Sequence, residues 1–588
     1  MFSPRCLCLL ILLSTGRVLA QISPDPYVPC QIMPQLIETY RADNRAIVRF
    51  YTTSFYGSRN RGSGTVDGTS PDTRSRLAAL DREYLAKLAA IDFAGLPQEC
   101  KVDYILFKRD MKENLRLLAV DSQRYESVRA WFPFADSVYA VERLRRRGHQ
   151  LDAAALAREW SKAAAQVNGL RAKLKRDSSL DLDLLYEAGL VAQDLRRGIG
   201  SIEAFYEGYD PMYTWWVPAN YKVLDDALGA YAEGFKENSK RFAANDKSGI
   251  VGRPIGRAEL VRQLQYEMIP YSPEELIGIA NKEFAWCDRE MLKASREMGF
   301  GDNWKAALEK VKNSYVPPGQ QPEMILRLFN ESVDFIKQHD LVTIPPLDEE
   351  TWGMIMMTPE RQRVNPFFTG GEEISISYPT DSMSEEDRMM TMRGNNPHFS
   401  RATVHHELIA GHNLEAFMNE RHRTYRDFGS GFWTEGWSLY WELLLWDLKF
   451  PQTPEDRIGM LFWHMHRCAR IIFSLNYHLG NWTPEQCIDF LVDRVGHERA
   501  NAAGEVRRSF ATDYPPLYQL AYLTGGRQFY ALKTELVDGG KMTYRQFHDD
   551  ILQLNAMPVE MIRCIMEGLP LEQDYQAKWR FYDKMVLP

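Results

Sequence analysis

Apolar residues recur every three or four positions along most of this chain, which is the spacing of amphipathic helices. In the first half the pattern predicts helices within residues 32–55, 73–175 and 182–242. In the second half it predicts helices at residues 272–298, 321–338, 401–418, 433–448, 455–476, 484–495, 517–536 and 544–556. Residues 373–379 instead alternate apolar and polar side chains, as a strand does. The pattern therefore predicts a mainly α protein with a small β element.

The first 20 residues have the composition of an export signal. Arg5 is followed by an unbroken apolar stretch from Cys6 to Leu13, and small residues precede Gln21. These features predict a signal peptide over residues 1–20, so the mature chain is expected to be secreted or periplasmic. The apolar stretch is too short to span a membrane, which takes about 20 residues, and no later segment reaches that length without charges.

The helical pattern is interrupted at residues 247–254, which contain glycine, serine and proline. The break divides the mature chain into an N-terminal helical region, residues 21–248, and a C-terminal helical region, residues 249–588. Most of the candidate chemistry falls in the second region, which we therefore expect to be catalytic.

Composition narrows the functional classes. A chain of 588 residues that is 45% hydrophobic and 26% charged can bury a large core and is not typical of a disordered protein. Because 79 acidic residues exceed 71 basic ones, the chain lacks the basic field of a general nucleic-acid binder. The six cysteines that follow the signal allow disulfides in an oxidising compartment, and none has the CxxC spacing of a structural zinc site.

Histidines are concentrated in one part of the chain. Nine of the 12 lie within a hundred residues: His398, His405, His406, His412, His422, His464, His466, His478 and His497. Histidine is the commonest metal ligand and the usual acid or base near neutral pH. The cluster therefore marks this part of the chain as a candidate active or metal-binding site.

A motif inside the cluster, VHHELIAGH, is similar to the HExxH helix of zinc peptidases but has a longer spacing. His406 and His412 are six residues apart, which on a regular helix means about 9 Å and about 600° of rotation, so they lie on different faces. His405 and His412 share a face but lie about 10 Å apart along the axis. Neither pair can hold one ion unless the helix bulges or kinks near Gly411.

The motif and its surroundings resemble a known family. HHELIAGHNLEAF, followed by FWTEGWSLYWELLLW, resembles the signature of the bacterial and fungal family called domain of unknown function 885 (DUF885), whose members typically have HEAxPGHH and then EGWALYxE. Residues 96–104 resemble the family's early helix, and residues 505–508 and 518–525 resemble its closing segment, so the likeness covers most of the mature chain. Two positions depart from the pattern: Ala410 replaces the usual proline and Asn413 the usual second histidine.

The family is similar in outline to the gluzincin metallopeptidases. The resemblance implies a large multi-helix gluzincin-like fold with a small β element near the active-site helix. It implies one zinc ion held by His406, His412 and Glu435, with Glu407 as the general base. We prefer Glu435 as third ligand because in related peptidases that glutamate is followed three residues later by a small or hydroxyl residue, as here.

Other polar residues of the motif have alternative interpretations. Glu442 lies seven residues after Glu435, about 10 Å further along the same helix face, and is expected to make an outer bond or to be solvated. Asn413, Glu415 and His405 are interpreted as polar groups on the helix surface, with His405 as a less favoured ligand.

Hydrolysis also needs hydrogen-bond donors for the oxyanion and residues that bind the substrate. Tyr518 and Tyr522, at i and i+4, are candidate donors, and core aromatics are the alternative. Arg508 is a candidate partner for a substrate carboxylate, with a surface salt bridge as the alternative. Residues 374–378 are a candidate edge strand for an extended peptide.

These features together predict an exported, zinc-dependent metallopeptidase-like hydrolase that cleaves short peptides through a metal-activated water. Two alternatives stay open. One is an exported helical peptide-binding protein without catalysis, which the altered Ala410 and Asn413 favour. The other is a metal-dependent hydrolase of a non-peptide amide. No nucleic-acid partner and no membrane span after signal removal are expected.

Overall fold

The computed structural model describes residues 30–51, 70–243, 245–362, 367–511 and 514–585. These residues form mainly α-helices with one two-stranded sheet, which confirms the predicted class. No helix in the described ranges combines the length and apolarity that crossing a membrane requires. The predicted signal peptide lies outside the described residues.

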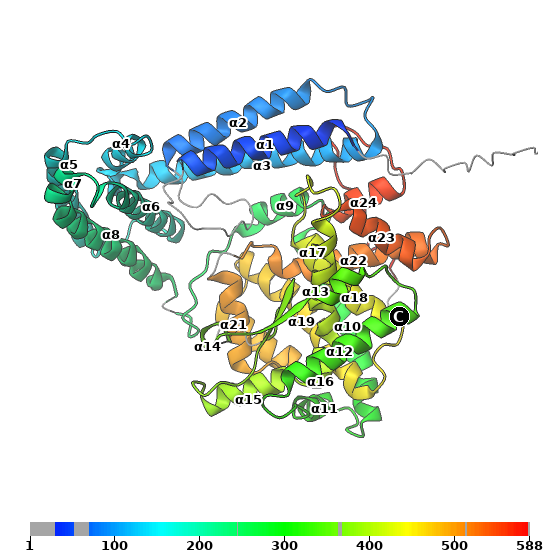
Figure 1. The fold of residues 1–588 in the computed structure, drawn as a ribbon. Coiled ribbons are helices and arrows are strands. Elements are labelled where there is room, and N and C mark those ends of the chain that lie inside the picture. Colours follow the sequence, from blue (N-terminus) through cyan, green and yellow to red (C-terminus); the bar gives the residue numbers. More distant parts are fainter. Residues whose placement is uncertain (1–29, 52–69, 244, 363–366, 512–513, 586–588) are drawn as a thin grey trace, which may run out of the picture.

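The first half of the chain is helical throughout its described part. Three long helices, α1–α3, lie side by side, and α4–α8 form a separate group at one end of them (Figure 1). The bounds are α1 Ile32–Tyr51, α2 Pro71–Ala89, α3 Gln98–Val128, η1 Arg129–Trp131, α4 Ala135–Arg145, α5 Ala153–Leu174, α6 Leu182–Tyr206, α7 Pro211–Trp216, α8 Pro218–Ser239 and η2 Lys240–Ala243.

The second half begins with helices that precede the histidine motif. Their bounds are α9 Gly256–Tyr266, α10 Pro273–Glu297, α11 Trp304–Lys312, α12 Gln321–Gln338, α13 Pro346–Thr351, α14 Pro359–Gln362 and α15 Glu385–Gly394. The motif and the helices after it have the bounds α16 Pro397–Glu407, α17 His412–Asn419, α18 Gly431–Asp447, α19 Pro454–His478, α20 Pro484–Phe490, η3 Leu491–Val495, α21 Arg499–Phe510, α22 Tyr518–Lys533, η4 Thr534–Asp538, α23 Tyr544–Leu554 and α24 Val559–Met566.

Local sequence explains where the helices of the site begin. The Asn396 side chain accepts hydrogen bonds from the backbone N–H groups of His398 and Phe399 at the start of α16, with Pro397 in the first turn. Capping boxes start α10 at Ser272 and α19 at Thr453. Nearly all of α18 is buried, and its glutamates Glu435 and Glu442 are among the buried residues.

Two hydrophobic cores hold the helices together. One consists of residues between 125 and 235, and helices α4–α8 contribute most of its side chains. The other joins α1–α3 to the helices that follow residue 250, including α16, α18, α19 and α22. The N-terminal three-helix layer therefore packs on the part of the chain that carries the histidine motif. The domain division at residue 248 stays a prediction.

The sheet consists of β1 (Gly353–Met356) and β2 (Glu373–Ile376), which pair in parallel with Gly353 opposite Glu373. The strand predicted at residues 373–379 is confirmed over Glu373–Ile376, and residues 377–379 lie beyond its end. Its other edge is not free, because Ser375 and Thr369 exchange two backbone hydrogen bonds at 2.7 and 3.2 Å. The expectation that residues 374–378 form an open edge for a peptide is therefore wrong at Ser375.

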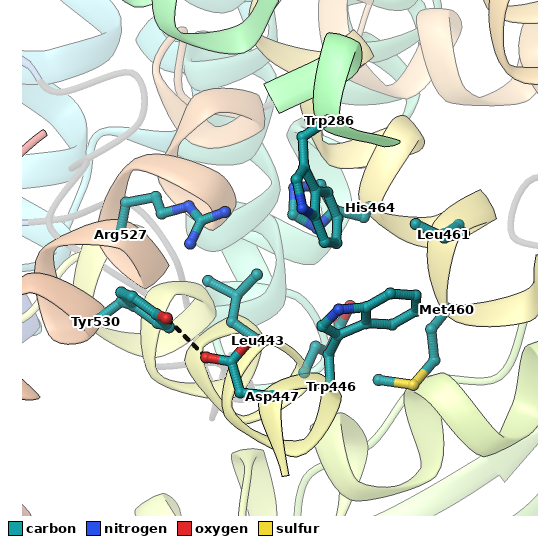
Figure 2. A pocket seen from close by; sticks show the side chains of 10 residues that line it. Trp286, Leu443, Trp446, Asp447, Met460, Leu461, His464, Arg527 and Tyr530 are labelled. Carbon is teal, nitrogen blue, oxygen red and sulfur yellow. Dashed lines mark hydrogen bonds between the residues drawn. The ribbon is translucent and has the colours of Figure 1, made fainter. Parts of the chain in front are cut away.

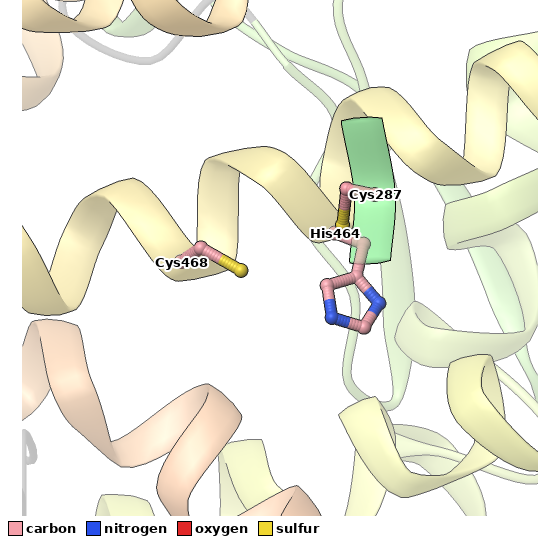
Figure 3. A group of neighbouring side chains, drawn as sticks. All are labelled: Cys287, His464 and Cys468. Carbon is pink, nitrogen blue, oxygen red and sulfur yellow. The ribbon is translucent and has the colours of Figure 1, made fainter. Parts of the chain in front are cut away.

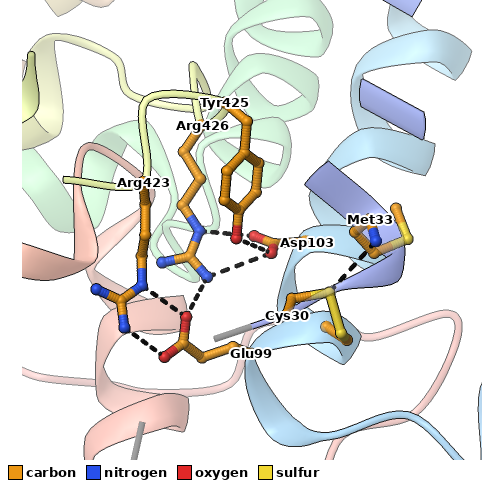
Figure 4. The surroundings of a disulfide bond; sticks show 8 residues. Cys30, Met33, Glu99, Asp103, Arg423, Tyr425 and Arg426 are labelled. Carbon is orange, nitrogen blue, oxygen red and sulfur yellow. Dashed lines mark hydrogen bonds and ion pairs between the residues drawn. A yellow bond between two sulfur atoms is a disulfide. The ribbon is translucent and has the colours of Figure 1, made fainter. Parts of the chain in front are cut away.

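A disulfide between Cys30 and Cys100 links the segment before α1 to α3 (Figure 4). Next to it, buried carboxylates of α3 accept hydrogen bonds from arginines that follow α17. Arg426 donates to Asp103 at 2.7 Å, and Arg423 donates to Glu99 at 2.8 Å. These buried ion pairs attach α3 to the loop that precedes α18.

Candidate metal centre

The helix that carries the histidine motif is interrupted between α16 and α17, where residues 408–411 form a turn. The Gly411 N–H donates to the His405 carbonyl at 2.9 Å. A Cβ atom on Gly411 would lie 2.0 Å from the His406 carbonyl oxygen, so only glycine permits this approach. The irregularity that the motif requires is present, and it returns His412 to the side of His406.

The turn brings the three expected ligands together. The Nε2 atoms of His406 and His412 lie 3.4 and 3.2 Å from the same oxygen, Oε2 of Glu435. The candidate ligand atoms all lie within 4.8 Å of one another. In a tetrahedral zinc site with bonds of 2.0–2.2 Å, neighbouring ligand atoms are about 3.3–3.6 Å apart. The two distances to Glu435 therefore match edges of a tetrahedral zinc site, and the third pair of ligand atoms lies within 4.8 Å.

The hydrogen bonds of Glu435 also fit a bound cation. Its Oε1 accepts from the hydroxyls of Tyr522, at 2.7 Å, and Tyr518. Its buried Oε2 has no hydrogen-bond donor in good geometry. A buried carboxylate oxygen without a partner is costly, and a cation between this oxygen and the two imidazoles would satisfy it.

The neighbouring charges of the protein keep Glu435 and His412 ionised. Burial raises the pKa of Glu435, but His412 and His406 outweigh it and hold that pKa well below its usual range. Burial lowers the pKa of His412, but Glu435 and Glu415 outweigh it and raise that pKa well above its usual value. The carboxylate is thus ionised and attracts positive charge, which a metal ion would supply.

The other ring nitrogens have partners of their own. Nδ1 of His406 lies 2.7 Å from Oε1 of Glu442, which also accepts from Arg467 at 3.1 Å. Nδ1 of His412 lies 3.1 Å from Oε1 of Glu415. A carboxylate on Nδ1 orients the ring and leaves Nε2 for the metal, as in most histidine-bound sites. Glu442 therefore lies within ion-pair distance of His406, as expected of an outer partner.

Three polar residues lie elsewhere than expected. The interpretation of Asn413, Glu415 and His405 as surface groups is wrong, because all three are buried. The amide of Asn413 donates to the Gly371 carbonyl at 3.0 Å, while His405 packs edge-on against Phe450. Asn413 and Glu415 are buried because the turn directs α17 back into the core, and His405 is buried in α16 before the turn.

Glu407 is held beside the centre by the loop that precedes β2. Its Oε2 accepts a hydrogen bond from the Gly370 N–H at 2.5 Å, and its carbonyl accepts from the Gly371 N–H at 3.2 Å. A Cβ on Gly370 would lie 2.1 Å from the Glu407 carbonyl oxygen, so this contact requires glycine. Sequence reasoning did not identify Gly370, although the pair Gly370–Gly371 and the strand pattern after it are visible in the sequence.

The tyrosines reach Glu435 because α18 and α22 cross closely. Gly436 and Gly525 meet at the crossing, and a Cβ on Gly436 would lie 2.7 Å from the Gly525 backbone. Burial, with Glu435 next in importance, raises the pKa of Tyr518 and of Tyr522, so both hydroxyls stay protonated donors. Their expected role toward a substrate oxyanion stays a prediction.

Arg508 belongs to a buried arginine–carboxylate group next to the tyrosines. Its Nη2 lies 2.6 Å from Glu505, which also accepts from Arg470 at 2.7 Å. The guanidinium of Arg470 lies over the Tyr522 ring, 4.3 Å from its centroid. Glu505 is thus shared by two arginines, and the role of Arg508 toward a substrate carboxylate stays a prediction.

Comparison with known proteins establishes the family. The family model described as "Bacterial protein of unknown function (DUF885)" matches residues 52–566. The chain belongs to the DUF885 family. No curated protein matches the chain in sequence.

Two solved structures share the fold of this DUF885 protein. One is described as a "putative lipoprotein of unknown function from Shewanella oneidensis", with 18% sequence identity, a TM-score of 0.63, and coverage of 91% of this chain and 100% of that one. The other is a "putative lipoprotein from Colwellia psychrerythraea", with 15% identity, a TM-score of 0.56, and coverage of 91% and 98%. At these identities the likeness concerns the fold alone.

Proposed function

We propose that this DUF885 protein is an exported, one-zinc hydrolase that cleaves short peptides. The observation that carries the proposal is the spacing of about one tetrahedral edge between the Nε2 atoms of His406 and His412 and the Oε2 atom of Glu435. Carboxylates behind both histidines support it, because they are the usual outer partners of metal-bound imidazoles.

His406, His412 and Glu435 would hold the ion. When bound, zinc would lower the pKa of a water molecule and polarise a scissile carbonyl group. Glu407 directly follows His406 and is not among the three ligands, so we assign it the role of the general base. The hydrogen bond from Gly370 to its Oε2 leaves Oε1 as the oxygen for this role.

Burial of the centre supports a small substrate. His406 and Glu435 are buried, and His412 is only partly exposed. A folded protein cannot bring a peptide bond to such side chains, whereas a short extended peptide can. We therefore assign short peptides, rather than intact proteins, as the substrate class.

Export rests on three observations. Residues 1–20 have the composition of a signal peptide. The disulfide between Cys30 and Cys100 is typical of oxidising compartments. The two proteins with a similar fold carry descriptions as lipoproteins, which are exported in bacteria. We propose a secreted or periplasmic location.

The experiment is a comparison of the wild type with His412→Ala. Zinc content is measured by elemental analysis, and hydrolysis of a short-peptide library by mass spectrometry. We expect the wild type to cleave peptides, to lose activity with a chelator and to regain it with zinc, and His412→Ala to hold one zinc fewer and to be inactive. Zinc-loaded wild type that cleaves no peptide would instead favour the peptide-binding protein, or a non-peptide amide substrate.

A further inference from the structure

A second cluster of metal-ligating side chains lies outside the centre described above. Cys287 of α10 and His464 and Cys468 of α19 point toward one another (Figure 3). One ligand atom from each lies within 4.8 Å of the others. Both sulfur-bearing side chains are fully buried, and His464 is 7% exposed. Three potential ligands thus converge in the core.

The spacing along each helix explains the convergence. His464 and Cys468 are four residues apart on α19, so they share a face of that helix. Glu283 and Cys287 have the same spacing on α10, which packs along α19. Two helices that face each other therefore supply the cluster without any CxxC motif.

Glu283 acts on His464 as an outer partner does in metal sites. Its Oε2 lies 2.9 Å from Nε2 of His464, and it forms a second ion pair with Arg527 of α22. The carboxylate therefore orients the imidazole, and Nδ1 is the ring nitrogen that Glu283 does not engage. A carboxylate on one nitrogen and a metal on the other is the common arrangement of metal-bound histidine.

A small cavity adjoins the cluster (Figure 2). It has a volume of about 20 Å³ and is lined by His464, Trp286, Trp446 and Arg527, among others. About 10–15 Å³ is enough for one water molecule where polar groups line the space. The cavity therefore has room for one water molecule beside His464, whereas Cys287 and Cys468 do not line it.

We infer that Cys287, His464 and Cys468 form a second zinc site, with Glu283 as the outer partner of His464 and a water as the fourth ligand. Two thiolates and one neutral imidazole are a ligand set typical of zinc, which takes four ligands at about 2.0–2.3 Å. Binding releases the two thiol protons and the Nδ1 proton of His464 to solvent, and it forms two sulfur–zinc bonds and one nitrogen–zinc bond, with no oxidation or reduction.

Charge balance favours a divalent ion. Two thiolates neutralise Zn²⁺, and the positive charge of Arg527 balances the negative charge of Glu283. The buried group is then neutral overall, which avoids the cost of an uncompensated charge in the core. A monovalent ion would leave one negative charge unpaired. The site would tie α10 to α19, the helix next to α16.

Cobalt(II) is the probe that separates this site from the first one. Thiolate–cobalt bonds give an intense charge-transfer absorption in the near ultraviolet, whereas the His406–His412–Glu435 centre contains no sulfur. We expect full-length, reduced wild type to develop this absorption with cobalt and to lose it when zinc is added. Cys468→Ser should reduce the absorption strongly, and His412→Ala should leave it intact.

Cys487→Ser is the matched control, since Cys487 is another free and fully buried cysteine outside the cluster. It should retain the absorption. Absence of the absorption in wild type with reduced thiols would overturn the site. So would peptide mapping that shows Cys287 joined to Cys468 as a disulfide in the protein as purified. The wild-type measurements decide the matter even if Cys468→Ser does not fold.

Discussion

Nδ1 of His406 lies 2.7 Å from Oε1 of Glu442, while Nε2 of the same ring lies 3.4 Å from Oε2 of Glu435. The two glutamates of α18 therefore contact opposite nitrogens of one imidazole. Seven residues separate them along the helix, so both cannot reach the same point, and the ring between them spans the distance. This arrangement makes Glu435 the candidate ligand and Glu442 the group that orients the ring.

The first prediction concerns this orienting carboxylate. Glu442→Gln should weaken zinc binding by about 10–100-fold, the usual cost of losing an outer partner of a metal-bound histidine. Competition with a chelator of known affinity measures the change. Glu350→Gln, at an exposed position, is the control and should bind zinc as the wild type does. Equal affinity in Glu442→Gln and wild type would contradict the assigned role.

The second prediction separates the base from the ligand. Glu407→Gln keeps the shape of the side chain but removes the proton acceptor, so zinc should be retained while turnover falls by about 10²–10⁴-fold. Glu435→Gln removes a charged ligand, so zinc affinity should fall together with activity. Zinc content and peptide hydrolysis are measured on both variants. Full activity in Glu407→Gln would refute this residue as the base.

The third prediction tests the turn between α16 and α17. Gly411→Ala would place a Cβ 2.0 Å from the His406 carbonyl oxygen, so the turn must open and move His412 away. We expect a large loss of zinc affinity and of activity. Gly278→Ala is the control, because a Cβ at this position of α10 meets no atom within 4 Å. Unchanged zinc binding in Gly411→Ala would mean that the close approach is not needed.

Sequence reasoning predicted the long helices and the strand of the site because their periodicity is local information. It did not predict the helices α9, α11, α15, α21 and α24. Length alone is not the reason, because α23 is no longer than α9 and was predicted. The motif spacing showed that a break near Gly411 was required, but not what it would bury. The burial of Glu415 and the contact between Gly370 and Glu407 depend on segments far apart in the chain, which no local pattern reports.

The same limit applies to the second cluster. Cys287 of α10 and His464 of α19 are 177 positions apart in the sequence, so only the packing of the two helices reveals the cluster. The i, i+4 spacing within each helix was visible, but such pairs are common on helix faces.

The fourth prediction concerns acid stability. Burial lowers the pKa of His548 from 6.5 to about 3. Its Nδ1 lies 2.7 Å from the Leu341 carbonyl, so Nδ1 carries the proton and Nε2 accepts from the Tyr440 hydroxyl at 2.8 Å. The pKa of His548 is lower in the folded protein than in the unfolded chain. The contribution of neutral His548 to the free energy of unfolding is therefore present above pH 6.5 and is lost as the pH falls from 6.5 toward 3.

Replacement of His548 by a side chain that does not titrate should reduce this dependence. In His548→Gln, the slope of the unfolding free energy against pH between 4 and 6 should decrease by roughly 1 kcal/mol per pH unit. Denaturant melts at several pH values measure it. The same change at exposed His149 should leave the slope as it is. An identical slope in His548→Gln would show that this histidine does not contribute.

The last prediction concerns the disulfide, which closes a loop with a sequence separation of 70 residues. Loop closure restricts the unfolded chain, so Cys30→Ala with Cys100→Ala should lower the free energy of unfolding by about 2–4 kcal/mol. The fold should persist, because the ion pairs of Glu99 and Asp103 with Arg423 and Arg426 also hold α3 in place. Denaturant melts with and without a reductant provide the check. The reductant should destabilise the wild type and leave the double variant unchanged, whereas equal stability of all four samples would show that the cross-link does not constrain the unfolded chain.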